Sequence, residues 1–507
     1  MKQSPIVIHP YLFAIFPALS IVADHVRFLS INRKILGMAL ITIMVAFLSN
    51  YLLTRAGIER RKAGIFVSLF LLLFFSYGHV YTLISDTFRG IDIRHRHLLF
   101  FWIILAIILV FLSTKASNIL APSTNFLNIM GACLVILSVI QIASYEISTR
   151  NVWKPARDLE STGETLESSE GLPDIYYIIL DTYASSSTLR EFYDFENNTF
   201  ISFLQDRGFF VAEESFSNYA VTALSLASSL NMDYIDKLSP NFGDSVEDWQ
   251  YAVPKQMIEN NNVTWFLKSR GYTFIFLGSG HGVTQGNRYA DRDIKCGFVD
   301  ETIGRIIQST LIWPAADQFQ IMANDDRHQR LCAFEKLAEM PANNGPIFVF
   351  AHILAPHLPF LFDANGNPVR EYEPDPVHIK EYYINQLIFI NKKVEETVTE
   401  ILSKSEVEPI IILQGDTGPP YGFETGAALQ NPGEEIYKQN LRILNAYHLP
   451  QDGAKWLYTG ISPVNTFRLI FNVYFGIDIP LLDNQSYFGT AEIPYRFIDV
   501  TESIDYH

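Results

Sequence analysis

Long apolar runs dominate the first 150 residues of this 507-residue chain. Four are long enough and apolar enough to span a bilayer, namely Ile35–Leu53, Ala63–Ile84, Leu98–Leu112 and Phe126–Ala143. A fifth run, Ile6–Ala23, is interrupted by one histidine and two prolines. Helices buried in a soluble core would not come four in a row with short charged loops between them. The pattern therefore predicts a transmembrane helix bundle over residues 1–147, with four or five spans.

A different pattern follows a short polar stretch. Residues 158–171 are rich in serine, glutamate, threonine and glycine and have no apolar period, so residues 148–172 are predicted to form a linker. From residue 173 to 507, strand-like and helical stretches alternate, which predicts a doubly wound, mostly parallel α/β sheet domain. The strand candidates are Asp174–Leu180, Thr273–Leu277, Ile347–Phe350 and Pro409–Leu413. The helix candidates include Asn198–Arg207, Thr222–Met232 and Ile379–Lys404.

The net charge changes where the hydrophobicity changes. Up to Arg150 the chain has 13 Lys and Arg against 5 Asp and Glu, and the remainder has 25 against 49. The acidic part offers no basic stripe, which excludes a nucleic-acid partner. If it handles phosphate, it needs a metal to neutralise its own carboxylates. The three cysteines, Cys133, Cys296 and Cys332, predict no disulfide framework.

The basic residues in the loops bear on orientation. The basic residues on the side of the α/β domain are Arg27, Arg33, Lys34, Arg89, Arg94, Arg96 and Arg150, with Lys154 and Arg157 nearby. Those on the other side are Arg55, Arg60, Arg61, Lys62 and Lys115. This distribution leans towards a cytoplasmic α/β domain.

Two predicted strands end in an aspartate. Asp181 follows DIYYIIL, and Asp416 follows PIIILQG. Ligands bind at the carboxyl ends of parallel strands, so the two carboxylates are candidates for one cation site, since each would otherwise raise the pKa of the other. Each aspartate by itself is as readily a helix cap or a turn residue.

Thr222 opens a helix of small residues, ALSLASSLNM. Free backbone N–H groups and the helix dipole favour an anion there, and a hydroxyl held against a metal can act as a nucleophile. The alternative is that Thr222 only caps the helix, which composition alone favours.

Histidines complete the candidate site. His352 and His357 lie in FAHILAPHLPF, a proline-rich turn after a strand, and two histidines in such a turn suggest ligand contact. His281, in GSGHG, is a weaker candidate and fits an ordinary turn residue.

In this order along the chain, Asp181 after a strand, Thr222 opening a helix, the HxxxPHxP turn and the late QGD-x-G strand end resemble the alkaline-phosphatase/sulfatase superfamily. The stretch Ser462–Arg468 is similar to the end of that domain, and the match covers residues 173–488. The membrane helices ahead of the domain resemble lipoteichoic acid synthases and phosphoethanolamine transferases more than soluble sulfatases.

The resemblance implies a sulfatase-like domain in which Asp181, Thr222 and Asp416 hold a metal. Thr222 would also be the nucleophile, and His352 and His357 would face the substrate. It also implies that the domain is extracytoplasmic, against the charge distribution of the loops. One departure from the family is Thr417, where the pattern Gly-Asp-His-Gly has a histidine ligand. Without that nitrogen, manganese or magnesium is favoured over zinc.

The predicted function is therefore a metal-dependent hydrolase or transferase acting on phosphate-type, or less readily sulfate, esters of the cell envelope. A membrane location favours a phosphate-ester or lipid-linked substrate and transfer over free hydrolysis. The alternative, which Thr417 favours, is a catalytically degenerate protein that uses the same fold as a binding or scaffolding module. A transporter gains little support, because few charges lie within the predicted spans.

Overall fold

The structure is a computed structural model that describes residues 6–26, 29, 31–88, 94–115, 120–150, 152–156, 171–238, 252–340, 345–369, 378–419, 432–489 and 495–504. The chain divides into two compact units. Unit 1 comprises Met1–Arg150 and Phe298–Asn324, and unit 2 comprises Asn151–Gly297 and Asp325–His507. Almost all of the predicted linker, and the basic loop residues Arg27 and Arg89, lie outside the described residues.

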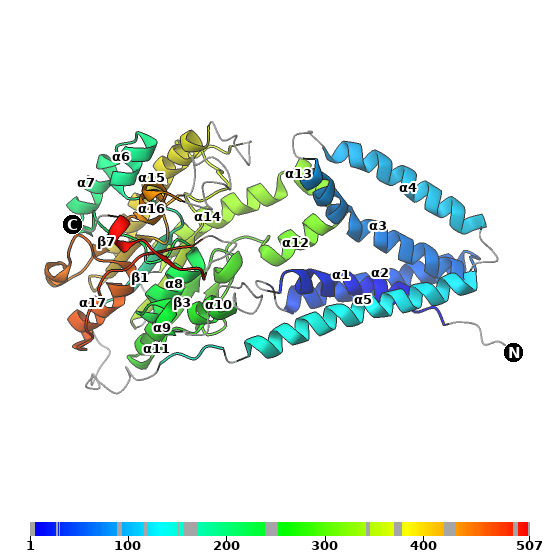
Figure 1. The fold of residues 1–507 in the computed structure, drawn as a ribbon, viewed down its shortest axis with the longest axis horizontal. Helices are drawn as coiled ribbons and strands as arrows, with labels where there is room; N and C mark the ends of the chain where they lie inside the picture. The colour runs from blue at the N-terminus through cyan, green and yellow to red at the C-terminus, as the bar shows by residue number, and fades with distance from the viewer. Residues whose placement is uncertain are drawn as a thin grey trace. The chain divides into compact units, whose positions relative to one another are not determined.

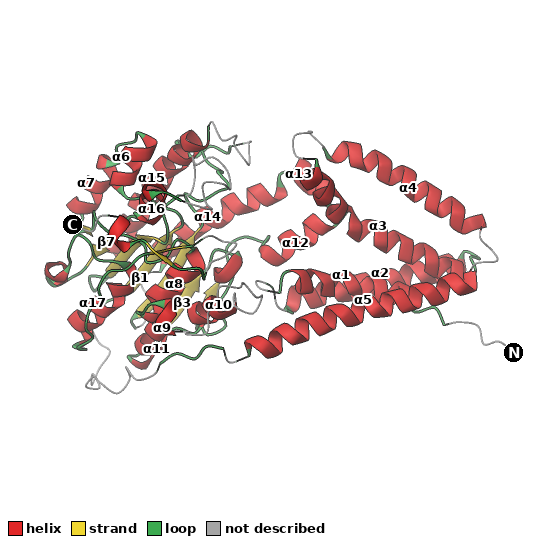
Figure 2. Cartoon of the chain, in the orientation of Figure 1, coloured by secondary structure: helices red, strands yellow, loops and turns green. Residues whose placement is uncertain are grey.

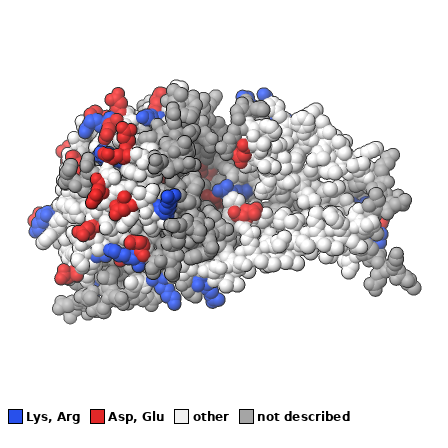
Figure 3. Space-filling view, in the orientation of Figure 1, with Lys and Arg blue, Asp and Glu red and all other residues white. Residues whose placement is uncertain are grey.

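The first 150 residues of unit 1 form helices. They are α1 (His9–Asp24), α2 (Arg33–Arg55), α3 (Arg60–Thr87), α4 (His95–Lys115) and α5 (Leu120–Thr149). All but α1 are long and apolar enough to cross a membrane, by length and composition. Large apolar side chains are exposed along α2, α4 and α5, and in Figure 3 the surface of these helices shows few charged groups. Such faces fit a lipid environment.

Unit 1 also contains a segment from the second half of the sequence. Phe298–Asn324 includes α12 (Glu301–Ser309) and α13 (Trp313–Gln318) and the start of α14 (Ile321–Glu339). We call Phe298–Asn324 the arm. The predicted first domain, residues 1–147, did not include the arm. The sequence of the arm is amphipathic and has no long apolar run, so it was not assigned to the apolar helices.

Unit 2 is built on a seven-stranded sheet in the order β2-β7-β6-β1-β5-β3-β4. The strands are β1 (Ile175–Leu180), β2 (Phe210–Val211), β3 (Thr273–Leu277), β4 (Arg292–Ile294), β5 (Ile347–Ile353), β6 (Ile410–Gly415) and β7 (Asn445–His448). The five from β6 to β4 are parallel, and β7 pairs antiparallel with β6 and β2. The predicted mostly parallel α/β domain is confirmed, and all described strands lie in unit 2 (Figure 2).

Helices cover both faces of the sheet, as Figure 1 shows. On one face lie α8 (Thr222–Asn231), α10 (Ala252–Glu259), α11 (Asn262–Ser269) and α17 (Pro463–Phe475), which share one hydrophobic core with the strands. On the other face lie α6 (Ser186–Tyr193), α7 (Asn198–Asp206) and α15 (Ile379–Lys404). Because both faces are covered, every residue of β1 is buried, which explains its unbroken apolar sequence.

The cysteines correct one expectation. Cys296 and Cys332 form a disulfide, whereas Cys133 is free and exposed. The sequence predicted no disulfide, because the two partners stand 36 residues apart and nothing in their spacing marks them as a pair. They meet because Cys296, in the loop after β4, contacts α14 in the folded domain.

Candidate functional site

Two buried aspartates lie side by side at the carboxyl edge of the sheet. Strands β1 and β6 are parallel neighbours in register, with Leu180 opposite Gly415. Asp181 and Asp416 are the next residues of the two strands, so they are adjacent although 235 positions separate them along the chain. Asp181 is 3% exposed and Asp416 is fully buried. The structure thus brings together the two predicted carboxylates.

Backbone contacts hold these aspartates in place. Thr182 adopts a left-handed conformation, with φ of 60°, and its backbone N–H donates to Asp416 Oδ1 over 3.0 Å. A Cβ at Gly415 would lie 2.4 Å from the backbone oxygen of Tyr183, so only glycine lets the two strand ends come this close. The backbone oxygen of Asp416 accepts hydrogen bonds from the hydroxyls of Ser217 and Ser225, at 2.6 and 2.7 Å.

Thr222 lies at the same edge. It is the first residue of α8, and Val221 occupies the cap position. The alternative reading, that Thr222 caps the helix, therefore does not describe its position. Its half-buried side chain lies beside the carboxylate of Asp416 and lowers the pKa of that group. The three residues predicted to be metal ligands thus converge in the structure.

His352 lies deeper than its predicted place in a turn. β5 runs on to Ile353, three residues beyond the predicted strand end, and His352 pairs with Ile179 within the sheet. It is 3% exposed, and its Nε2 atom lies 3.2 Å from Asp181 Oδ2. Ligand atoms of His352, Asp181 and Asp416 all lie within 4.8 Å of one another. A buried imidazole therefore joins the two carboxylates.

The hydroxyl of Thr284, which was not predicted from the sequence, orients the imidazole of His352. Thr284 Oγ1 lies 2.7 Å from His352 Nδ1 and 2.7 Å from the hydroxyl of Ser279. Both hydroxyl residues belong to the loop after β3 that contains the weak candidate His281. Nε2 of His281 itself lies 3.7 Å from an oxygen of Asp326. In the segment GSGHGVT, the residues that matter for the site are therefore Ser279 and Thr284, which position His352.

The charges in this cluster are strongly coupled. Burial raises the pKa of Asp416 to about 6, and the neighbouring charge of Asp181 adds to the rise. Burial also opposes ionisation of Asp181, but positive charge on His357 and the close contact with His352 lower its pKa overall. Burial opposes the charged form of His352, yet its contacts with Asp181 raise its pKa. Asp181 thus ionises readily, whereas Asp416 keeps its proton up to a higher pH.

The donor set fits a divalent cation. Asp181 Oδ1, Asp416 Oδ2 and His352 Nε2 are buried and lack hydrogen-bond partners among the described residues. Leaving such atoms unsatisfied is costly. A cation bound to two carboxylates and an imidazole would satisfy all three atoms.

The loop after β5 places His357 beside the cluster. Its backbone N–H donates to the backbone oxygen of Asp181 over 3.2 Å, and its side chain is half-buried. Two buried side chains hold the loop from behind. Gln386 of α15 donates to the backbone oxygens of Pro356 and His357, and Arg330 of α14 donates to that of Pro359. Neither residue was predicted from the sequence, because nothing local marks a buried glutamine or arginine.

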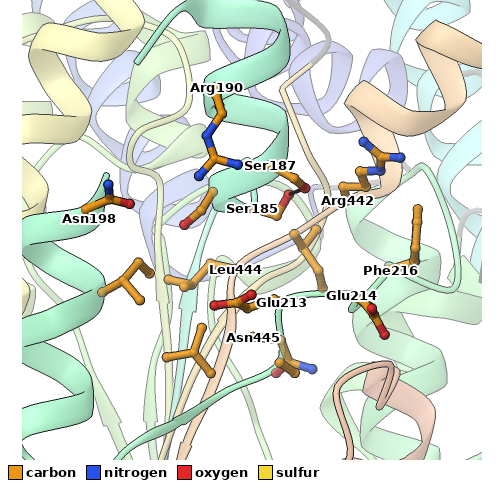
Figure 4. A pocket seen from close by; sticks show the side chains of 15 residues that line it. Ser185, Ser187, Arg190, Asn198, Glu213, Glu214, Phe216, Arg442, Leu444 and Asn445 are labelled. Carbon is orange, nitrogen blue, oxygen red and sulfur yellow. Dashed lines mark hydrogen bonds between the residues drawn. The ribbon is translucent and has the colours of Figure 1, made fainter. Parts of the chain in front are cut away.

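Thr417 and one cavity are two further features of unit 2. Thr417, which stands where the family pattern has a histidine, is 4% exposed and directly follows Asp416. A separate cavity of about 340 Å³ is lined by the start of α6, by residues after β2 and by residues before β7. Figure 4 shows Arg190, Ser185 and Ser187 around it, with Glu213 and Arg442. The predicted site residues do not line this cavity.

This chain is similar to several solved structures at low sequence identity. No family model matches it, and no curated protein matches it. Among solved structures, the C-terminal periplasmic domain of EptC from Escherichia coli is 14% identical, covering 70% of this chain and 98% of its own, with a TM-score of 0.42. The integral membrane lipooligosaccharide phosphoethanolamine transferase A from Neisseria meningitidis is 10% identical, covering 92% and 95%, with a TM-score of 0.40.

Another similar structure is a putative sulfatase from Bacteroides fragilis. It is 14% identical, covers 65% of this chain and 83% of its own, and has a TM-score of 0.38. The structural neighbours are thus phosphoethanolamine transferases and sulfatases, the groups that the sequence motifs resemble. At this distance they transfer no activity to this chain.

Proposed function

We propose that the protein is a metal-dependent hydrolase or transferase of phosphate-type esters, with sulfate esters as the second class of substrate and Thr222 as its nucleophile. One observation carries the proposal. A hydroxyl, two carboxylates and an imidazole, drawn from four distant parts of the chain, converge at the carboxyl edge of the sheet. Three of their buried atoms lack partners among the described residues. A site with only a structural role would not leave three buried polar atoms without partners.

Asp181, Asp416, His352 and Thr222 would hold the cation. When bound, a divalent cation supplies charge neutralisation and lowers the pKa of a nearby hydroxyl. His352 would supply a nitrogen donor in place of the histidine that is missing at Thr417. The absence of a nitrogen ligand therefore no longer favours manganese or magnesium over zinc. With two carboxylates and one imidazole, the donor set suits zinc and manganese alike. His352 is then a ligand and not a substrate contact, and His357 keeps the substrate role.

The residues can divide the reaction into two displacements. Thr222 Oγ1 forms a bond to phosphorus, and the bond from phosphorus to the leaving oxygen breaks. The carboxylate of Asp416, which lies beside Thr222, takes the hydroxyl proton. His357 donates a proton to the leaving oxygen. In the second displacement, water or an acceptor hydroxyl attacks phosphorus and gives its proton to His357. The bond from phosphorus to Thr222 Oγ1 breaks, and Asp416 returns the proton to Thr222.

We place the domain outside the cytoplasm, with a lipid-linked or cell-envelope ester as substrate and transfer favoured over hydrolysis. The apolar helices of unit 1 keep the chain at a membrane. The disulfide between Cys296 and Cys332 supports an oxidising compartment, against the leaning of the loop charges. An export-dependent phosphatase fused after Arg150 should be active. An inactive fusion, with an active cytoplasmic reporter at the same point, would contradict the assignment.

The activity test uses the full-length protein in detergent, with a generic phosphodiester and added Mn²⁺, Mg²⁺ or Zn²⁺. Thr222→Ala should lose turnover, and Thr222→Ser should keep part of it, because serine also presents a hydroxyl. Thr399→Ala, on the outer side of α15, is the matched control and should stay active. Mass spectrometry should find phosphate on Thr222 after brief reaction. Turnover by Thr222→Ala would exclude the covalent mechanism.

The second candidate is the catalytically degenerate binding module, which Thr417 favours. Calorimetric metal titration of the native protein and of Thr417→His separates the two readings. If the native site is functional, it binds a divalent cation, and the added imidazole tightens binding and shifts it towards zinc. If neither protein binds metal, the enzyme proposal fails and the binding module stands.

A further inference from the structure

The arm, Phe298–Asn324, is joined to the helices of unit 1 by specific contacts. Lys34 Nζ, at the start of α2, lies 2.7 Å from Asp300 Oδ2. The side-chain amide of Asn32 donates to Thr302 Oγ1 over 3.2 Å. Ile306 packs against the core formed by α1, α2 and α5. The polar contacts therefore meet α2 at its first turn, which is one end of a candidate membrane span.

The arm also packs closely on α3. The backbone N–H of Leu311 donates to the backbone oxygen of Phe74 over 2.8 Å. A Cβ at Gly78 would lie 1.8 Å from the backbone oxygen of Gln308, so this approach requires glycine on α3. Trp313 lies edge-on to the rings of Tyr81 and His95, with centroids 5.2 Å apart in both pairs. Clusters of Trp and Tyr are typical of the level where a membrane meets water.

Despite these contacts, the arm exposes large apolar side chains. Phe319 and Phe298 are each 71% exposed, Ile312 is 49% exposed and Ile321 is 43% exposed. Four such residues within 24 positions form a patch that water does not favour. The arm's charged residues are three acidic groups and one arginine, so attraction to anionic headgroups does not explain the patch.

We propose that the arm is a membrane-interface anchor whose exposed apolar side chains insert between lipid acyl chains beside α2, α3 and α4. The inference rests on the proposed embedding of these helices in a bilayer. Its contacts with the end of α2 put the arm at the boundary of the lipid. Burial of apolar surface drives the insertion.

The arm gives the α/β domain additional chain connections to the membrane unit. Besides the connection after Arg150, the chain passes between the units at residues 297–298 and 324–325. Cys296 and Cys332 stand on the two sides of the arm along the chain, and their disulfide ties the two strands of chain together within unit 2. An arm anchored in lipid would thus keep the α/β domain at the membrane surface, where a lipid-linked ester is presented.

Nitroxide labels in nanodiscs of phosphatidylcholine and phosphatidylglycerol test the proposal on the full chain. Cys133→Ser removes the free cysteine, and single cysteines then replace Phe319, Ile312, Phe101 or Trp456. Phe101, 65% exposed on α4, reports whether the spans are in lipid, and Trp456, 60% exposed in unit 2, reports an aqueous site. Collisions with oxygen and with a soluble nickel complex are measured by power saturation.

We expect labels at Phe319, Ile312 and Phe101 to collide more with oxygen than with nickel, and the label at Trp456 to do the reverse. High salt should not change the result, since charge plays no part. If Phe101 reports lipid while Phe319 and Ile312 report water, the anchor is refuted and the spans stand. Weak collisions with both reagents at the arm would mean that protein covers it, which also refutes the anchor. A Phe101 label in water would refute the embedding and the anchor together.

Discussion

Asp416→Asn should stabilise the metal-free protein while abolishing metal binding. The substitution keeps the shape of the side chain, and the amide oxygen can still accept the hydrogen bond that Thr182 donates to Oδ1. It removes the negative charge that Asp416 carries at neutral pH next to Asp181. Burial and the neighbouring negative charge of Asp181 raise the pKa of Asp416 to about 6 from an ordinary value of 3.8. The folded state therefore resists ionisation of Asp416.

The magnitude follows from this difference in pKa. A carboxyl with a raised pKa binds its proton more tightly in the folded than in the unfolded chain, so its ionisation costs stability. The loss begins as pH rises through about 4, where the unfolded chain ionises, and is complete above about 6. A difference between 3.8 and about 6 corresponds to about 3 kcal/mol. At about 2 °C per kcal/mol, the melting temperature changes by roughly 6 °C.

Thermal unfolding of the full-length protein in detergent with a chelator measures the effect. At pH 8, Asp416→Asn should melt several degrees above the native protein, and at pH 4 the difference should vanish. Adding Mn²⁺ or Zn²⁺ should stabilise the native protein and leave Asp416→Asn unchanged. Asp206→Asn, at the exposed end of α7, is the matched control. A variant that melts below the native protein at pH 8 would show that the folded chain stabilises the ionised carboxylate by itself, and the argument for a cation site would fail.

Further predictions concern the surroundings of the site. Metal affinity should weaken as pH falls below about 6, because Asp416 and His352 must lose protons to bind a cation, and chelator competition across pH would show it; a flat profile would contradict these ligands. Thr284→Val should weaken metal binding by about 10–100-fold with little change in melting temperature, because it frees the His352 ring to turn; unchanged binding would remove Thr284 from the site. Reducing the disulfide between Cys296 and Cys332 should destabilise unit 2 by about 3–4 kcal/mol, from the 36-residue separation. Cys296→Ala/Cys332→Ala should melt like the reduced protein, and a native melting temperature unchanged by reductant would show the disulfide to be absent.

Much of the candidate site could be predicted from sequence, because a parallel sheet places the residues after its strands at one edge. Asp181 and Asp416 each follow a strongly apolar strand, so their meeting needed only that the strands be neighbours. Thr222 could be found because a helix start beside a strand end is a recurring anion site. These signals are local, and each is readable within about ten residues.

The sequence by itself determined the apolar helices, the α/β class and the candidates Asp181, Thr222 and Asp416, because periodicity and strand ends are local properties of the chain. Tertiary structure alone decided that His352 joins the carboxylates, since β5 continues past its predicted end. It also decided that Thr284 orients His352, that Cys296 meets Cys332, and that the arm packs with the apolar helices of unit 1. These contacts join residues 36 to about 270 positions apart, and no short-range pattern of residues encodes such a distance.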